Sequence, residues 1–320
     1  MIDVGLLEVR DLAVCYKSLW GVYKVLDGVS LNVGKGEIVG IAGESGSGKS
    51  TLAEGVLRLI RPPGYIPKGK VIFEGVDLLM LGEQELQQIR WKKLAYIPQG
   101  SMNSLNPVLK IGDQMTDVMM DHGIKDKREM RDHIVERLRR VGLSESVLSR
   151  YPHELSGGMR QRVVIVMATL LDPTLIIADE PTTALDIVSQ KQVITQIIDL
   201  NREMGTSVML ISHDLSIHAQ ASDRLVIMYA GKIVEFDRIT KIFERPSHPY
   251  TSLLLESVPR LEKREIKGIP GLAPSPLNWP SGCRFHTRCP IADEYCANVE
   301  PELRMKSEDH EAGVACHKAG

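Results

Sequence analysis

Short, mostly apolar runs that end in polar residues recur along this chain. Four of them are Ile38–Ala42, Leu94–Ile97, Leu175–Ala178 and Ser207–Ile211. Runs of this length with little polar alternation predict strands that are buried on both faces, as in the parallel sheet of an α/β protein. In open sheets of this kind ligands bind at the carboxyl ends of the strands, so the polar residues after each run are candidate site residues.

The rest of the chain shows other patterns of apolar, glycine and proline residues. Residues 6–40 alternate short β-type runs with glycine turns, which predicts an antiparallel subdomain, and residues 51–60 predict a helix that ends before Pro62. A polar, helical pattern predicts a helical subdomain over about 107–165. Prolines become frequent after residue 245, so we place a boundary there, between a domain at 1–245 and a C-terminal extension at 246–320.

Two helical stretches carry apolar residues at helical spacing. Ile134, Leu138 and Val141 share one face of a charge-rich segment, which indicates a helix with a solvated opposite face. Met115, Met119 and Met120 lie at similar spacing nearer the N-terminus. They indicate packing inside the helical subdomain or a pliable docking groove for a membrane partner.

Composition limits where the protein works. Among 320 residues, 43% are hydrophobic, and 39 basic residues against 41 acidic residues give a net charge of −2. This balance argues against an electrostatic nucleic-acid binder. The start of the chain lacks the features of a signal peptide, and no apolar run approaches the ~18 residues typical of a membrane helix. We therefore expect a cytoplasmic protein whose membrane role comes through partners.

A glycine-rich loop follows the first apolar run. Residues 43–51 read GESGSGKST and match G-x-x-x-x-G-K-[ST] between a predicted strand and a predicted helix. In such a loop the backbone N–H groups surround the phosphates of a nucleotide, Lys49 contacts the β and γ oxygens, and the Ser50 hydroxyl binds Mg²⁺. The predicted ATP-binding residues are Gly43, Ser45, Gly46, Gly48, Lys49, Ser50 and Thr51.

The other strand ends supply polar groups that suit ATP hydrolysis. Asp179 would hold Mg²⁺, and Glu180, one residue further, would act as the base that polarises the attacking water. Gln99 would contact Mg²⁺ or this water through its amide. His213 would donate a hydrogen bond to the γ-phosphate or the water.

A second glycine motif predicts a second phosphate contact. Ser156, Gly157 and Gly158 open a predicted helix, and the first N–H groups of a helix, together with its dipole, attract an anion. The chain thus carries two phosphate-binding elements.

Taken in order, GESGSGKST, YIPQ, LSGGMRQR, LIIADEP, TALD and ISHD resemble the motifs of ABC-type ATPases over roughly residues 6–245. The resemblance implies a P-loop NTPase core of the ABC type with an antiparallel β-subdomain, a helical subdomain and here a small irregular C-terminal extension. It implies that two cassettes meet head to tail, so that Ser156, Gly157 and Gly158 close on the ATP of the other chain. It also assigns Gln161 to the nucleotide site and Asp186 to the loop after Glu180.

The family places an aromatic ring against adenine ahead of the P-loop. Trp20 is the first choice, with Tyr23 and Tyr16 as competitors, because stacking needs only a π face. All three could instead be core aromatics of the β-subdomain.

The C-terminal extension at 246–320, called the tail below, narrows the resemblance to one branch of this family. The runs HPYTSLLLESVP at 248–259 and GCRFHTRCP at 282–290 resemble the dipeptide/oligopeptide importer branch of ABC ATPases. This implies a peripheral subunit at the cytoplasmic face of the membrane, with two permease subunits, an external solute-binding protein and usually a second, non-identical ATPase chain. Related importers carry oligosaccharides or nickel, so the cargo stays open. A soluble, non-transport ABC ATPase is the remaining alternative.

Four of the five cysteines, Cys283, Cys289, Cys296 and Cys316, lie in the tail. Disulfides are disfavoured in the cytoplasm, which leaves a metal. The spacing C-x₅-C-x₆-C-x₁₉-C lacks the close pairs of structural zinc sites, and relatives with such tails imply a [4Fe–4S] cluster. Zinc stays an alternative, because His286 and His317 lie beside these cysteines.

Overall fold

The chain divides into two units, each assembled from segments that are distant in sequence. Residues 1–34, 38–79 and 210–320 form the first unit, and residues 35–37 and 80–209 form the second. The computed structural model describes residues 5–101, 104–257, 268–306 and 312–319, so residues 1–4 and the last two positions of HPYTSLLLESVP lie outside the described part.

The first unit contains an antiparallel sheet with the strand order β2-β1-β4-β5. Its strands are β1 (Leu7–Ser18), β2 (Gly21–Val33), β4 (Gly64–Phe73) and β5 (Val76–Asp77). The predicted antiparallel subdomain is therefore confirmed, and it extends to strands that follow the P-loop. Leu7, Leu12 and Leu26 are fully buried and form part of its core.

A second group of strands in this unit has the order β11-β12-β10-β9-β3. These strands are β3 (Ile38–Ala42), β9 (Arg224–Tyr229), β10 (Lys232–Arg238), β11 (Arg304–Met305) and β12 (Gly313–Val314). β3 and β9 run parallel, whereas β9, β10, β12 and β11 pair antiparallel. β3 is buried along its whole length, as its apolar sequence predicts.

The helices of this unit are short. They are α1 (Lys49–Val56), α7 (Leu215–Ala221), α8 (Ile239–Glu244), α9 (Pro249–Glu256) and α10 (Glu294–Asn298), with a 3₁₀ turn η4 at His286–Arg288. α1 begins at Lys49 and ends at Val56, so the prediction of a helix to residue 60 was too long. Arg58 takes the left-handed φ of 52° in place of the usual glycine, and the N–H of Leu59 bonds back to the carbonyl of Glu54 at 2.8 Å, which closes the helix.

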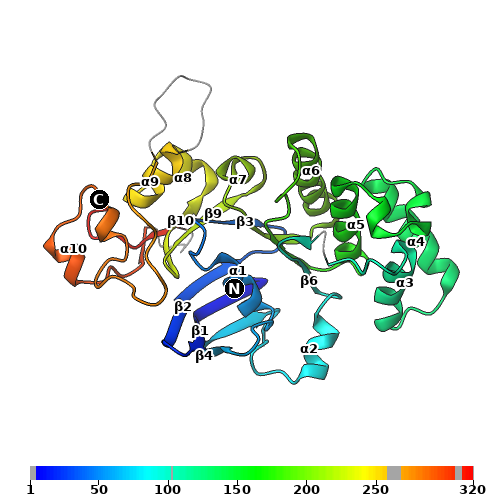
Figure 1. Cartoon of the computed structure of the whole chain (residues 1–320), viewed down its shortest axis with the longest axis horizontal. Coiled ribbons are helices and arrows are strands. Elements are labelled where there is room, and N and C mark those ends of the chain that lie inside the picture. Colours follow the sequence, from blue (N-terminus) through cyan, green and yellow to red (C-terminus); the bar gives the residue numbers. More distant parts are fainter. Residues whose placement is uncertain (1–4, 102–103, 258–267, 307–311, 320) are drawn as a thin grey trace. The chain divides into compact units, whose positions relative to one another are not determined.

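The second unit contains the parallel pair β6 (Leu94–Ile97) and β7 (Leu175–Asp179), and β8 (Ser207–Ile211) crosses the boundary between the units. Its helical elements are α2 (Glu83–Ile89), α3 (Ile111–Asp121), α4 (Lys127–Arg140), η2 (Glu145–Ser149), η3 (Pro152–Glu154), α5 (Gly157–Thr169) and α6 (Ile187–Met204). α3, α4 and α5 pack together (green in Figure 1).

The apolar face of α4 is confirmed, since Ile134 and Leu138 are buried. Met115 and Met119 are also buried, whereas Met120 is 51% exposed. The packing interpretation therefore holds for the first two methionines, and they do not form a surface groove.

The tail packs on the first unit's sheet. α8, which directly precedes the tail, and α9 lie beside β9 and β10 (Figure 1). Tyr229, Tyr250 and Phe285 pack ring against ring at centroid distances of 4.6 to 5.3 Å. The fully buried Glu235 of β10 accepts hydrogen bonds from the N–H groups of Ser247 and His248. This buried carboxylate fixes the point where the chain enters the tail.

The motif His-Pro-Tyr starts α9. His248 is the N-cap, and its Nδ1 accepts a hydrogen bond from the Tyr250 N–H at 3.0 Å, while Pro249 takes the first helical position. Burial lowers the pKa of His248 to about 4, so the ring is neutral at physiological pH and Nδ1 is available as an acceptor.

This buried histidine predicts acid sensitivity. Its folded pKa of about 4 is below the ordinary 6.5, so the unfolded chain takes up the proton first as the pH falls. The free energy of unfolding therefore decreases as the pH falls from 6.5 towards about 4. About 2 kcal/mol of it should be lost between about pH 7 and about pH 5. In urea unfolding, we expect His248→Asn, which keeps a capping acceptor without a titrating ring, to lack this component. Equal losses in wild type and variant would contradict the prediction.

Candidate nucleotide-binding site

The P-loop connects β3 to α1 in the first unit. Gly48 is the N-cap of α1 with φ 102°, and Lys49 is the first residue of the helix. Lys49 is 7% exposed, and its ammonium donates to the carbonyl oxygens of Gly43, at 2.8 Å, and Glu44, at 3.0 Å. The lysine therefore lies along the loop, where a phosphate group could replace its carbonyl partners.

Close packing dictates glycine at the start of this loop. Gly43 has φ 152°, and a Cβ there would lie 2.2 Å from the carbonyl oxygen of Met228 in β9. The loop is also tied to the turn after β9, because the Gly231 N–H donates to the Ser47 carbonyl at 3.0 Å. Gly46, in contrast, has φ 80° with open space around it. Side chains are thus excluded at Gly43 by protein atoms, and at Gly46 by backbone conformation alone.

Ser45 lies within the same loop, and Ser50 and Thr51 belong to the first turn of α1. The Thr51 side chain hydrogen-bonds to the Tyr16 hydroxyl, so Tyr16 supports the helix. Tyr16 and Tyr23 face each other across β1 and β2. Trp20 occupies the turn between these strands and is 83% exposed, so its indole is available for stacking. Its contact with adenine stays a prediction.

His213 follows β8 and is exposed. Asp214 next to it caps α7 by accepting from the Ser216 N–H at 2.8 Å. His218, which belongs to none of the sequence motifs, is fully buried, and its ring contacts the Ser212 carbonyl oxygen at 3.1 Å and the Ser222 hydroxyl at 3.2 Å. His218 thus fixes the backbone beside His213.

In the second unit, the parallel register of β6 and β7 places Ile97 opposite Ala178. The residues that follow, Gln99 on one strand and Asp179 and Glu180 on the other, therefore share one edge of the sheet. Asp179 is fully buried, and the Tyr96 hydroxyl lies 3.5 Å from its Oδ2. Gln99 is exposed.

Glu180 has a strained backbone. Its φ is 49°, a left-handed value that is uncommon for a residue with a side chain, and the residue is 8% exposed. The Thr183 hydroxyl donates to its Oε2 at 3.3 Å. Strain of this kind gathers at functional sites, where the surrounding structure must hold it.

The Ser-Gly-Gly motif starts α5 as predicted. Ser156 is the N-cap, and its Oγ accepts from the Met159 N–H at 3.3 Å. The N–H groups of Gly157 and Gly158 lie in the first turn, where a helix offers them no acceptor. A Cβ at position 158 would lie 2.7 Å from the Ser189 Oγ, so a larger residue there would displace the Ser189 side chain.

Gln161 and Asp186, two further residues that the resemblance assigned to the site, form hydrogen bonds within the second unit. The predicted nucleotide ligand Gln161 is 2% exposed, and its Oε1 accepts from the Ser101 hydroxyl at 2.7 Å. This bond links the segment after Gln99 to α5. Asp186 caps α6 by accepting from the N–H and the hydroxyl of Ser189.

The four tail cysteines are neighbours. The pKa of the Cys283 thiol is raised to about 11, mainly by burial, with smaller contributions from the nearby thiols of Cys316, Cys289 and Cys296. Within the described ranges, however, no three His, Cys, Asp or Glu side chains are grouped so that they could hold a metal. His286 and His317 each place a ring nitrogen on a backbone carbonyl. Neither the expected iron–sulfur cluster nor its zinc alternative is supported by this arrangement.

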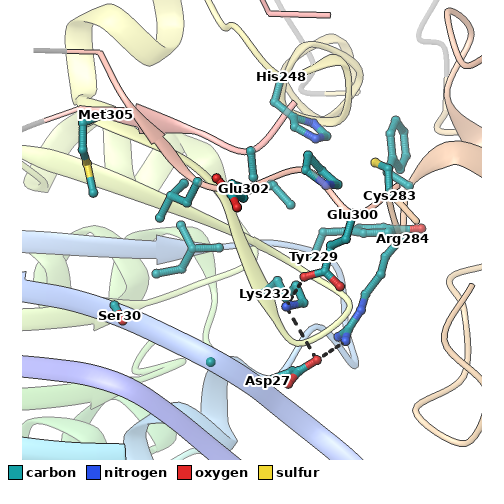
Figure 2. A pocket seen from close by; sticks show the side chains of 17 residues that line it. Asp27, Ser30, Tyr229, Lys232, His248, Cys283, Arg284, Glu300, Glu302 and Met305 are labelled. Atoms are coloured by element: carbon teal, nitrogen blue, oxygen red, sulfur yellow. Dashed lines mark hydrogen bonds and ion pairs between the residues drawn. The ribbon is translucent and has the colours of Figure 1, made fainter. Parts of the chain in front are cut away.

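A cavity of about 580 Å³ lies where the tail meets β2, β9 and β10. Arg284 of the tail is paired with Asp27 of β2, and Lys232 of β10 lies 3.6 Å from the same carboxylate (Figure 2). The Trp279 indole N–H also donates to the Lys24 carbonyl at 2.8 Å. These contacts fix the tail to β2.

Comparison with known proteins agrees with these motifs. The family model "ABC transporter" matches residues 26–183, and the model "Oligopeptide/dipeptide transporter, C-terminal region" matches residues 234–296. The dipeptide transport ATP-binding protein DppD of Caldanaerobacter subterraneus subsp. tengcongensis is 41% identical over 98% of this chain and 96% of its own length. The chain belongs to the ABC transporter family.

Other relatives agree with this assignment. The oligopeptide transport ATP-binding protein OppD of Bacillus subtilis is 44% identical over 95% of this chain and 87% of its own length. Among solved structures, the ATP-binding cassette MJ0796, a dimer in a post-hydrolysis state bound to ADP and Pi, is 28% identical with a TM-score of 0.66, over 73% of this chain and 98% of that one. The P-loop ABC ATPase fold is therefore confirmed, and the chain is an ATPase of a transporter. Among the described helices, none has the length and apolar character needed to span a membrane.

Proposed function

We propose that this chain hydrolyses ATP to drive import of peptides across the cytoplasmic membrane. The observation that carries the proposal is the similarity of the whole chain, tail included, to dipeptide and oligopeptide transport ATP-binding proteins. Similarity confined to the ATPase motifs would support only a transporter of undefined cargo.

Each site residue has a proposed role. The P-loop N–H groups and Lys49 bind the phosphates of ATP, and Ser50 and Asp179 supply oxygens for Mg²⁺, a cation that prefers such ligands. Gln99 orients the metal or the attacking water, Glu180 accepts a proton from that water, and His213 donates to the γ-phosphate. Trp20 stacks on adenine.

We further propose that two ATPase chains act together. Ser156, Gly157 and Gly158 of one chain would close on the nucleotide of the other, and the exposed start of α5 supports this role because its first N–H groups suit a phosphate. The dimeric state of the MJ0796 cassette agrees with such pairing. The second chain is expected to be non-identical. Both ATPase chains would lie at the cytoplasmic face of the membrane and work with two membrane permease subunits and an external solute-binding protein. We place the ATPase domain at 1–245, with its helical subdomain at about 107–165, and the tail at 246–320.

The transport function predicts a specific uptake result. In vesicles that hold the assembled transporter with its binding protein, we expect ATP-dependent uptake of a labelled tripeptide. Glu180→Gln should abolish uptake and reduce hydrolysis by at least about 100-fold while keeping ATP affinity, since an amide cannot act as base. Lys49→Ala should abolish uptake through lost ATP binding.

Two results would contradict this function. Uptake of an oligosaccharide or of nickel in place of the tripeptide would change the cargo. Hydrolysis by Glu180→Gln close to that of wild type would place the base elsewhere.

For the tail, we propose that Cys283, Cys289, Cys296 and Cys316 bind a [4Fe–4S] cluster. The support for this is the chemistry of the residues alone, because an all-thiolate set of four cysteines suits iron–sulfur clusters and zinc. A cluster would brace a segment with little apolar core of its own.

Anaerobic purification tests this cluster. The protein should be brown, with broad absorption near about 400 nm and about four irons per chain. Cys289→Ser should lose the colour, whereas Cys15→Ser, in β1, should keep it. Colourless protein with one zinc per chain, or with no metal, would refute the cluster.

A further inference from the structure

The P-loop contains an acidic residue, Glu44, directly after Gly43. A carboxylate in a loop that binds a polyanion is electrostatically unfavourable, because like charges repel more strongly where water is partly excluded. The Glu44 side chain is 27% exposed, so solvent screens it only in part. Its charge therefore needs a partner.

Arg288 in the tail is that partner. Its guanidinium donates to both carboxylate oxygens of Glu44, at 2.6 Å and 3.0 Å, in the two-pronged geometry that gives strong, well-oriented ion pairs. The Arg288 side chain is only 4% exposed. This ion pair joins positions that are 244 residues apart in sequence.

Arg288 is itself held in place. Its Nε donates to the Pro270 carbonyl at 2.7 Å, and one terminal nitrogen lies 3.3 Å from the Tyr229 hydroxyl. The guanidinium also lies 5.8 Å from the centre of the Tyr229 ring. These contacts leave the arginine one orientation, directed at the P-loop.

The backbone of Glu44 is fixed as well. Its N–H donates to the Tyr250 hydroxyl of α9 at 2.8 Å. Its carbonyl oxygen accepts from Lys49 Nζ at 3.0 Å and from the Ser47 N–H at 3.2 Å. The side chain, N–H and carbonyl of one P-loop residue thus have separate partners, of which two come from the tail.

We propose that Arg288 is a positioning residue of the nucleotide site: by neutralising and orienting Glu44 it keeps the P-loop in its phosphate-binding conformation and sets the affinity for ATP. The tail is then a part of the ATP site. Arg288 does not contact the reacting atoms, so its effect falls on binding and not on the hydrolytic step.

The test is a double-mutant cycle on the full chain, with the Kd for MgATP from titration calorimetry and kcat and KM from hydrolysis. Arg288→Ala should raise Kd and KM about tenfold, because the Glu44 charge is left uncompensated, and kcat should stay within about twofold. Adding Glu44→Ala should return Kd to the value of Glu44→Ala alone. The rise in Arg288→Ala should also shrink between about 0.05 M and about 0.5 M salt.

Lys306→Ala is the matched control. Lys306 also pairs a tail cation with a carboxylate of the first unit, Glu235, at 3.1 Å, but at β10 and not at the P-loop. Its Kd should equal that of wild type. Should Arg288→Ala fail to fold, Arg288→Lys keeps the charge without the fork and should give a smaller rise that Glu44→Ala again removes.

Three results would overturn the proposal. An unchanged Kd in the Arg288 variant would leave the ion pair without effect on the site. A raised Kd that persists in the double variant would mean that Arg288 acts only by holding the tail. An equal rise of the Kd in Lys306→Ala would also mean that Arg288 acts only by holding the tail.

Discussion

A phosphate-binding loop must turn its N–H groups inward and its carbonyl groups outward, and the first unit is built around that requirement. Gly43 lies so close to the Met228 carbonyl oxygen of β9 that a Cβ would clash with it, and the Ser47 carbonyl oxygen accepts a hydrogen bond from the Gly231 N–H. Lys49 holds two more carbonyls of the loop. Strands, turn and tail therefore meet at one short segment, and its conformation depends on all of them.

The motif that begins α9 has a physical explanation in this setting. Neutral His248 caps the helix, Pro249 starts it, and Tyr250 then directs its hydroxyl at the Glu44 N–H. A tyrosine whose ring packs on Tyr229 and Phe285 holds its hydroxyl rigidly as an acceptor at that position. The His-Pro-Tyr motif at the start of the tail therefore serves to bring a hydroxyl to the P-loop backbone.

Much of the fold could be predicted from the sequence. The strands β3, β6, β7 and β8 lie where uninterrupted apolar runs predict them, and α5 starts at Ser156 because the cap and glycines are local signals. The length of α1 was missed, since it ends through an arginine in a conformation usually taken by glycine. The strand β4 was also missed, because its glycines and proline are typical of a turn.

The candidate site was predictable only as far as local motifs reach. The strand-end residues Gln99, Asp179 and Glu180 do lie at one edge, as parallel pairing requires. The role of Glu44 was not visible, because its partners Tyr250 and Arg288 lie more than 200 residues away and a pairing at that distance leaves no pattern. The buried contact of Gln161 with Ser101, 60 residues apart in sequence, is likewise non-local and was not predicted.

Hydrogen–deuterium exchange on the native full chain, with and without a non-hydrolysable MgATP analogue, tests most directly whether the tail is part of the ATP site. If it is, protection on nucleotide binding should appear together in the P-loop at residues 43–51 and in the tail at residues 283–289, since coupled segments are stabilised together. Protection of the P-loop with no change in residues 283–289 would contradict this coupling.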